Sequence, residues 1–172
     1  EVEKLKILGF KTATLDCRLL LSQILEKANP VYTHEQVNIS KNEIINFQTL
    51  VKQRQKGKPV SRILNKRNFW KREFMLNGDT LDPRPDSEIL IEAVLEYFPN
   101  KTQLLKILDL GSGTGCLGLS LLEEYQDSLI SFVDVSKNSL EIVKKNSHQF
   151  WLKGTLKYIH LDWRAHDWDT QL

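Results

Sequence analysis

The 172-residue sequence predicts an α/β protein with a small N-terminal helical bundle, a β-hairpin connector and a domain built on a parallel sheet. Helical spacing of apolar residues dominates the first sixty positions, whereas from Leu104 onward short apolar strand segments alternate with amphipathic helical segments. Such alternation is typical of βαβ units, whose strands are parallel and whose crossovers are right-handed. We therefore expect a helical domain over residues 1–59, a connector over 60–82 and an α/β domain over 83–172.

Two amphipathic helices are expected in the helical domain. The first covers residues 12–28 and ends at Asn29-Pro30. Its apolar face consists of Leu21, Ile24, Leu25 and Ala28, with Leu20 beside them. The second begins with a capping box, in which the side chains of Ser40 and Glu43 each satisfy an orphan backbone N–H, and it ends before Gly57.

Strand-forming aromatic residues between Val60 and Leu81 predict the hairpin, with Asn77-Gly78-Asp79 as its turn signal. Pro85 precedes the next helix, whose apolar stripe starts at Leu90. The parallel strands are expected at residues 104–110, 129–134 and 157–161, with helices at 117–125 and 136–150.

Composition and charge exclude several classes of protein. With 41% hydrophobic and 27% charged residues the chain is neither collagen-like nor fully disordered, and no apolar run approaches the ~18 residues of a membrane helix. A net charge of +2 gives no whole-molecule attraction to nucleic acid or acidic lipid. The two cysteines, Cys17 and Cys116, are too few for a disulfide scaffold. We expect a monomeric cytoplasmic protein with no membrane partner.

A glycine-rich loop follows the first parallel strand and precedes a helix. It reads Asp109-Leu110-Gly111-Ser112-Gly113-Thr114-Gly115, and Asp134 ends the next strand. Glycines let a ligand lie against bare backbone at a helix N-terminus, and a carboxylate at the second strand end can accept hydrogen bonds from both ribose hydroxyls. The pattern predicts an adenosine-containing cofactor; the alternative is that Asp109 and Asp134 only cap strand ends.

S-adenosylmethionine (SAM) suits this loop better than a dinucleotide does. Gly113, Gly115 and Gly118 formally match the fingerprint G-x-G-x-x-G, but the first glycine of a dinucleotide site directly follows the strand, where Gly111 stands. Asp109 would also place a negative charge beside a pyrophosphate, whereas SAM carries a sulfonium, an ammonium and no phosphate.

Asp162 and Trp163 follow the third strand at the same sheet edge. We expect Asp162 to accept a hydrogen bond from the adenine amino group and Trp163 to pack on the ring, the alternative being that Trp163 belongs to a core or an interface. The candidate cofactor-binding residues are Asp109, Gly111, Ser112, Gly113, Thr114, Gly115, Asp134, Asp162 and Trp163.

Five stretches together match the pattern of a known family. They are Arg18-Leu19-Leu20-Leu21, Gly57-Lys58-Pro59, Phe69-Trp70, Pro83-Arg84-Pro85-Asp86-Ser87-Glu88, and the glycine loop with Asp134. In these stretches the chain resembles the peptide chain release factor glutamine methyltransferases (PrmC/HemK family). The resemblance implies a helical substrate-docking domain and a Rossmann-like, SAM-dependent methyltransferase domain. It also implies methyl transfer to the glutamine side-chain nitrogen in the Gly-Gly-Gln motif of a release factor.

Some positions depart from the family pattern. Asp82 replaces an aliphatic residue, and Asn65 and Lys71 replace glycines, of which Asn65 tolerates a positive φ. The family's Asn-Pro-Pro-Tyr catalytic motif, which follows the fourth strand, is absent from residues 1–172. We therefore expect an incomplete methyltransferase domain with no catalytic residue and little turnover of its own.

Nine basic residues and no acidic residue lie in the stretch 52–72. We expect this stretch to meet an acidic surface of the release factor or RNA, the alternative being an ordinary solvated face. Lys66, Arg67 and Arg84 are candidates for substrate contact. No metal is expected, because the acidic and histidine residues after His160 fit no zinc or calcium spacing.

Two other functions stay open on the sequence alone. The chain could belong to a SAM-dependent methyltransferase that acts on ribosomal-protein glutamine or on adenine in nucleic acid. It could also be a non-catalytic module that binds a partner.

Overall fold

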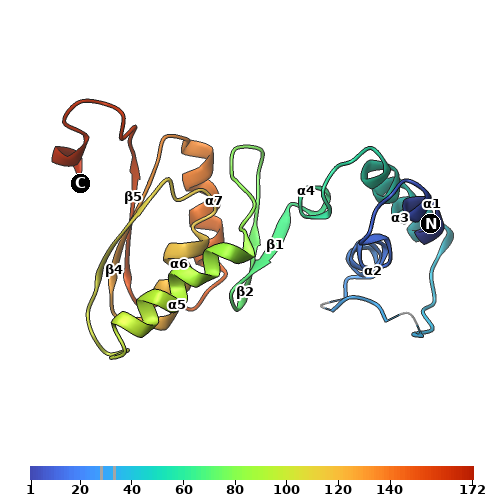
Figure 1. Ribbon diagram of the computed structural model, residues 1–172, viewed down its shortest axis with the longest axis horizontal. Helices are drawn as coiled ribbons and strands as arrows, with labels where there is room; N and C mark the ends of the chain where they lie inside the picture. The colour runs from blue at the N-terminus through green and yellow to red at the C-terminus, as the bar shows by residue number, and fades with distance from the viewer. Residues whose placement is uncertain (28, 33) are drawn as a thin grey trace. The chain divides into compact units, whose positions relative to one another are not determined.

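The computed structural model describes residues 1–27, 29–32 and 34–172, which form two compact units (Figure 1). Unit 1 comprises Glu1–Asn65, and unit 2 comprises Lys66–Leu172. In this described part of the chain, no helix has the length and apolar character needed to cross a membrane.

Unit 1 is helical throughout its regular structure. Its helices are α1 (Val2–Ile7), α2 (Ala13–Ile24), α3 (Lys41–Gln55) and α4 (Val60–Leu64). Their apolar faces meet in a core formed by Leu5, Ala13, Cys17, Leu20, Val51 and Ile63. The predicted helix over 12–28 is therefore present but ends four residues earlier, at Ile24, and Ala28 lies outside the described residues.

The predicted capping box at the start of α3 is confirmed. The Ser40 hydroxyl accepts a hydrogen bond from the Glu43 N–H at 3.3 Å, and the Glu43 carboxylate accepts one from the Ser40 N–H at 2.7 Å. The reciprocal pair satisfies two donors that would otherwise face solvent unpaired at the helix N-terminus.

The hairpin turns at a different place from the one predicted. Strands β1 (Lys66–Phe69) and β2 (Arg72–Met75) are antiparallel, and Phe69 pairs with Arg72 across a two-residue turn at Trp70-Lys71. The stretch Asn77-Gly78-Asp79 instead forms a local turn after β2. There the Asn77 side-chain oxygen accepts from the Asp79 and Thr80 N–H groups, both at 3.0 Å. Because asparagine can satisfy its own neighbours' backbone, the turn signal needs no partner strand.

The start of the expected connector also differs. Residues 60–64 form helix α4 rather than strand, and Asn65 ends that helix in the left-handed conformation, with φ 54°. The positive φ explains why asparagine is an acceptable replacement for glycine at this position.

Unit 2 contains the predicted parallel sheet, in the order β3-β4-β5. Its strands are β3 (Lys106–Leu110), β4 (Leu129–Asp134) and β5 (Thr155–His160), and the helices between them are α6 (Cys116–Glu124) and α7 (Lys137–His148). Helix α5 (Glu88–Tyr97) follows a short 3-10 turn, η1 (Pro85–Ser87), and a second one, η2 (Trp168–Gln171), lies near Leu172 (Figure 1). The α/β class and the alternating order of elements are thus confirmed.

The hairpin belongs to the core of unit 2. Phe69 and Phe74, one from each of its strands, are fully buried beside Leu119 of α6 and Phe132 of β4. The two hairpin rings meet edge to face, with centroids 6.2 Å apart. Burial of two phenylalanines attaches the hairpin to the sheet domain far more firmly than surface contacts would.

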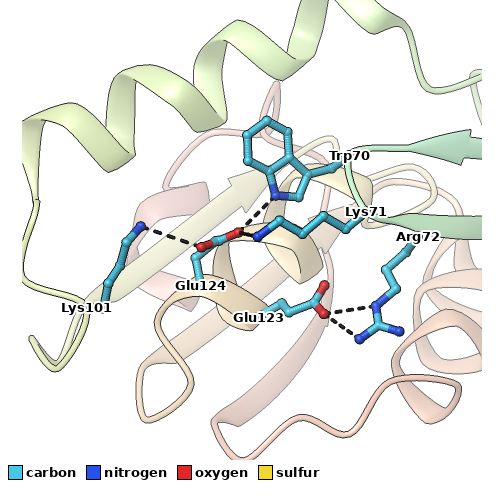
Figure 2. A network of polar contacts seen from close by, with 6 residues as sticks. All are labelled: Trp70, Lys71, Arg72, Lys101, Glu123 and Glu124. Atoms are coloured by element: carbon cyan, nitrogen blue, oxygen red, sulfur yellow. Dashed lines mark hydrogen bonds and ion pairs between the residues drawn. The ribbon is translucent and has the colours of Figure 1, made fainter.

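Polar contacts attach the turn of the same hairpin to α6 (Figure 2). The Trp70 indole N–H donates to the Glu124 carboxylate at 3.0 Å, and the Lys71 ammonium pairs with the same carboxylate. Lys101 approaches it at 3.6 Å, and the Arg72 guanidinium pairs with the neighbouring Glu123. Two hydrogen-bond donors and a further ammonium group around one carboxylate form a network, which holds geometry better than an isolated surface pair.

Gly118 lets α6 lie close to the sheet. A Cβ at this position would stand 2.4 Å from Ile130 Cδ1 and 2.5 Å from Phe132 Cε1. We expect Gly118→Ala to lower the free energy of unfolding by about 1–3 kcal/mol, the usual cost of overpacking. Chemical denaturation measures it.

Gly78→Ala is the matched control, because a Cβ there meets no atom within 4 Å and the backbone φ is not positive. It should leave stability unchanged or raise it slightly. Equal stability of the two variants would contradict the packing argument.

Candidate functional site

The glycine loop turns sharply at the carboxyl end of β3. Gly111, Gly113 and Gly115 have φ values of 71°, 54° and 76°, a conformation that residues with a Cβ rarely adopt. The N–H groups of Gly111 and Ser112 both donate to Val133 O of the neighbouring strand, at 2.8 and 3.0 Å. The loop is thereby anchored to the sheet edge, and α6 begins directly after Gly115.

Asp134 holds the middle of this loop. One of its carboxylate oxygens accepts from the Gly113 N–H at 2.9 Å, and the other accepts from the Ser136 N–H at 2.8 Å. Each carboxylate oxygen can accept a second hydrogen bond, so the group can also bind a ligand hydroxyl. The structure thus gives Asp134 a loop-holding contact that the sequence did not predict, and its contact with a ribose stays a prediction.

Asp109, the last residue but one of β3, directs its carboxylate toward the first turn of α6. Its carboxylate accepts a hydrogen bond from the Gly118 N–H at 3.1 Å. Desolvation within the protein, with a smaller contribution from the negative charge of Asp134, raises the pKa of Asp109 to about 6, although the hydrogen bond from Gly118 opposes the rise. A carboxylate in this setting gains most from a nearby cation, because only a positive charge compensates for its lost hydration.

Trp163 covers the first glycine of the loop. A Cβ on Gly111 would stand 3.1 Å from the Trp163 ring, which leaves the indole half-exposed beside bare backbone. The next residue, Arg164, donates to both oxygens of Asp162, with its Nε at 2.8 Å from one and its terminal nitrogen at 2.7 Å from the other. These hydrogen bonds lower the pKa of Asp162 to about 2, so its carboxylate is ionised at neutral pH.

Two hollows flank the loop and share Gly111. The first, of about 250 Å³, is lined by Gly111, Val133, Asp134, Val135, Leu161, Asp162, Trp163 and Arg164. The second, of about 190 Å³, includes Arg84, Asp109, Ser112, Gly113 and Thr114 in its lining. The structure therefore brings together the predicted cofactor residues from three strand ends, with Gly115 behind them.

Cys116 also lines the second hollow. Burial raises the pKa of its thiol to about 11, so the group stays protonated and is a poor nucleophile.

The predicted substrate-contact residues lie in two places. Arg84 lines the second hollow, directly before η1. Lys66 and Arg67 lie on β1 of the hairpin, and Lys66 pairs with Glu73 at 3.2 Å. Their contact with a substrate stays a prediction.

The basic stretch 52–72 is partly neutralised within the chain. At least four of its basic residues have acidic partners, in the pairs Arg54–Asp16, Lys66–Glu73, Lys71–Glu124 and Arg72–Glu123. These acids come from elsewhere in the sequence or from the opposite strand, so the stretch is less positive in the fold than it is in the sequence. Among the described residues, no group of three or more His, Cys, Asp or Glu side chains could hold a metal ion.

Sequence reasoning missed two residues at the site. No motif in the sequence marks Arg164, and its side-chain hydrogen bonds to Asp162 are visible only in the structure. Asn146 is fully buried on α7 and donates to Thr114 O of the glycine loop at 2.9 Å. The signal that could have found it is its place on the apolar face of that helix, one turn after Ile142 and Val143.

The pKa of Asp109 predicts a pH-dependent stability. A carboxyl whose pKa is about 6 in the folded protein and 3.8 as an ordinary side chain binds its proton more tightly when folded. Its favourable contribution is present below pH 3.8 and is lost as the pH rises through 6. Asp109→Asn should therefore gain stability relative to the wild type between pH 4 and 7, by at most about 3 kcal/mol.

Urea denaturation at several pH values measures this difference. Asp127→Asn, at an exposed position before β4, controls for the loss of one negative charge. A constant difference between Asp109→Asn and the wild type over this pH range would show that the carboxyl is not desolvated.

Each of the two units is matched by a known protein family. The family "Methyltransferase small domain" matches residues 76–170, and "PrmC N-terminal domain" matches residues 2–64. A methyltransferase domain agrees with the cofactor expected from the loop, SAM.

Curated relatives carry the same indication. "Release factor glutamine methyltransferase" of Buchnera aphidicola subsp. Baizongia pistaciae is 33% identical over 87% of this chain and 53% of its own length. The protein of that name from Shewanella oneidensis is 35% identical over 92% of this chain and 56% of its own. A "Bifunctional methyltransferase" of Rickettsia bellii is 31% identical over 93% of this chain and 34% of its own. The chain thus spans about half the length of the release factor glutamine methyltransferases that it matches.

Among solved structures, a SAM-dependent methyltransferase from Agrobacterium tumefaciens has a TM-score of 0.47 and 20% identity, over 56% of this chain and 32% of that chain. The two family matches together cover nearly all of the chain and confirm the resemblance noted in its sequence. The chain belongs to the methyltransferase small domain family, and a PrmC N-terminal domain precedes that domain.

Proposed function

We propose that this chain binds SAM at the glycine loop and serves in N5-methylation of the glutamine in the Gly-Gly-Gln motif of a peptide chain release factor. The observation that carries the proposal is the meeting of three carboxylates, from the ends of β3, β4 and β5, around one glycine loop. The carboxylates are those of Asp109, Asp134 and Asp162.

The charges at the loop suit a cationic cofactor. Asp109 and Asp134 stand on either side of the loop, and each accepts a backbone hydrogen bond from it or from the helix that follows. A pyrophosphate placed there would meet their negative charge, whereas a sulfonium or ammonium would be attracted by it. When bound, SAM supplies an electrophilic methyl group.

The first hollow is suited to an adenosine. Asp134 lies where ribose hydroxyls could donate to it, and Asp162 and Trp163 offer a carboxylate and an aromatic surface next to it. The Arg164 pair fixes the plane of the Asp162 carboxylate, which reduces the rotamer freedom that binding would otherwise remove.

The chemistry of the methyl acceptor, a glutamine amide, limits the role that we assign to residues 1–172. An amide nitrogen is a poor nucleophile, because its lone pair is delocalised into the carbonyl, and it must be held in line with the methyl group by acceptors for its N–H groups. The family resemblance places these acceptors in an Asn-Pro-Pro-Tyr motif that residues 1–172 do not contain. We therefore assign cofactor binding and substrate docking to this part of the protein.

The substrate is proposed from two further observations. The helical unit matches the PrmC N-terminal domain over residues 2–64, and relatives above 30% identity are named release factor glutamine methyltransferases. These matches support a docking role for unit 1 and a release factor as the partner.

Asp134→Ala should weaken SAM binding about tenfold to a hundredfold. The variant loses charge-assisted hydrogen bonds to the ribose worth ~1.5–3 kcal/mol, and it also frees the Gly113 N–H. Isothermal titration calorimetry measures the change in Kd. Asp127→Ala, before the opposite end of β4, is the control and should bind SAM as the wild type does. Unchanged affinity in Asp134→Ala would move the cofactor site elsewhere.

The substrate is tested with the protein at its full natural length. Incubation with SAM and a release factor, followed by peptide mass spectrometry, should give one added methyl group on the Gly-Gly-Gln glutamine. A release factor with alanine in place of that glutamine is the control and should stay unmodified. Methylation of ribosomal protein or DNA instead, with the release factor untouched, would overturn the proposed substrate.

A further inference from the structure

We infer that Asn146 is a positioning residue that couples the hairpin to the cofactor loop. This inference rests on the proposed function in one respect, namely that SAM binds at the glycine loop. Asn146 lies on α7, touches neither hollow, and would act through the backbone of Thr114.

Every hydrogen-bonding position of the Asn146 side chain is occupied. Its Oδ1 accepts from the Met75 N–H at 2.8 Å and from the Gln149 side chain at 3.1 Å. Its Nδ2 donates to Met75 O at 3.2 Å and to Thr114 O at 2.9 Å. A primary amide has two donor hydrogens and one oxygen with two lone pairs, so the group is saturated in this orientation. Because the side chain is fully buried, water cannot replace a lost partner.

The contact with Met75 resembles strand pairing. The Asn146 amide both accepts from the N–H and donates to the C=O of one residue, as a backbone amide of a neighbouring strand would. Aspartate has no donor for Met75 O or Thr114 O, and leucine has neither donor nor acceptor. Among side chains of this size, only asparagine therefore offers both the donors and the acceptor that these partners need.

The same helix fixes the loop at a second point. A Cβ on Gly115 would stand 2.8 Å from Val143, which lies one helical turn before Asn146 on α7. Together with the Asp134 bond to Gly113, these contacts engage three successive loop residues, two of them from α7, which lines neither hollow. A shift of Asn146 would therefore move the backbone against which a cofactor lies.

The hairpin is fixed independently at its other end. The Trp70 N–H donates to Glu88 at 2.8 Å, and the indole donates to Glu124, as Figure 2 shows for the latter. The hairpin is thus held at its turn by acidic side chains and at Met75 by Asn146. Because Asn146 binds both Met75 and Thr114, ordering of the glycine loop and ordering of the hairpin are coupled. A cofactor that orders the loop should therefore also order the hairpin around Met75.

Amide hydrogen exchange on the unmodified protein tests the coupling directly. Saturating SAM should slow exchange in a peptide that contains Met75, in addition to peptides of the glycine loop. Exchange in a peptide from α2 of unit 1 is the control and should not change. Unchanged exchange at Met75 while the loop becomes protected would overturn the inference alone. Failure of the protein to bind SAM would overturn the cofactor site and this inference together.

Asn146→Asp provides the second measurement. It keeps the size and the acceptor but removes both donors, and we expect its Kd for SAM to rise about tenfold and the SAM-dependent protection at Met75 to disappear. Tyr125→Phe is the matched control for lost stability. It removes buried hydroxyl bonds to Val94 O and Phe98 O at the far end of α6, so it should be destabilised yet bind SAM normally. A folded Asn146→Asp variant with wild-type affinity would contradict the positioning role.

Discussion

The close approach of α6 to the sheet at Gly118 is the constraint on which the candidate site depends. Because no side chain separates the helix from β4, the Gly118 N–H reaches the Asp109 carboxylate and the first turn of α6 lies directly behind the glycine loop. A side chain at position 118 would push α6 away from the sheet, and the glycine loop that precedes α6 would move with it. The space of one methyl group at Gly118 thus determines how closely α6 lies to the Asp109 carboxylate and to the glycine loop.

Charge is distributed unevenly between the two sides of unit 2. Acidic groups gather at the carboxyl ends of the strands, whereas two basic side chains of the hairpin, Lys71 and Arg72, pair with Glu124 and Glu123 on α6 (Figure 2). Two of the positive charges that stand out in the sequence therefore serve to attach the hairpin. The same network explains two of the family landmarks, since the Trp70 backbone donates to Glu88 and its indole donates to Glu124.

The sequence predicted the elements that have strong internal periodicity. The strands and helices from β3 to β5 lie within a few residues of their predicted positions, because apolar segments and a glycine loop mark each boundary. Helices α1 and α4 were missed, since six and five residues are too short to show a period. The hairpin turn was misplaced, because Asn77 forms local side-chain bonds that compete with strand pairing. Of the site, the loop and its carboxylates were predictable; Asn146 was not, because its partners lie 32 and 71 residues away.

That last separation has a consequence for how the protein is made. Met75 finds its side-chain partner only after 71 further residues have been synthesised, and the Trp70 indole waits for 54. At about 5–20 residues per second, the hairpin spends several seconds on the ribosome with its phenylalanines unburied and its second strand lacking a partner on one side. The helices of unit 1, whose core residues lie between Leu5 and Ile63 and so are all synthesised before the hairpin, can meanwhile fold. A nascent chain paused before α7 would therefore leave the apolar face of the hairpin exposed for longer.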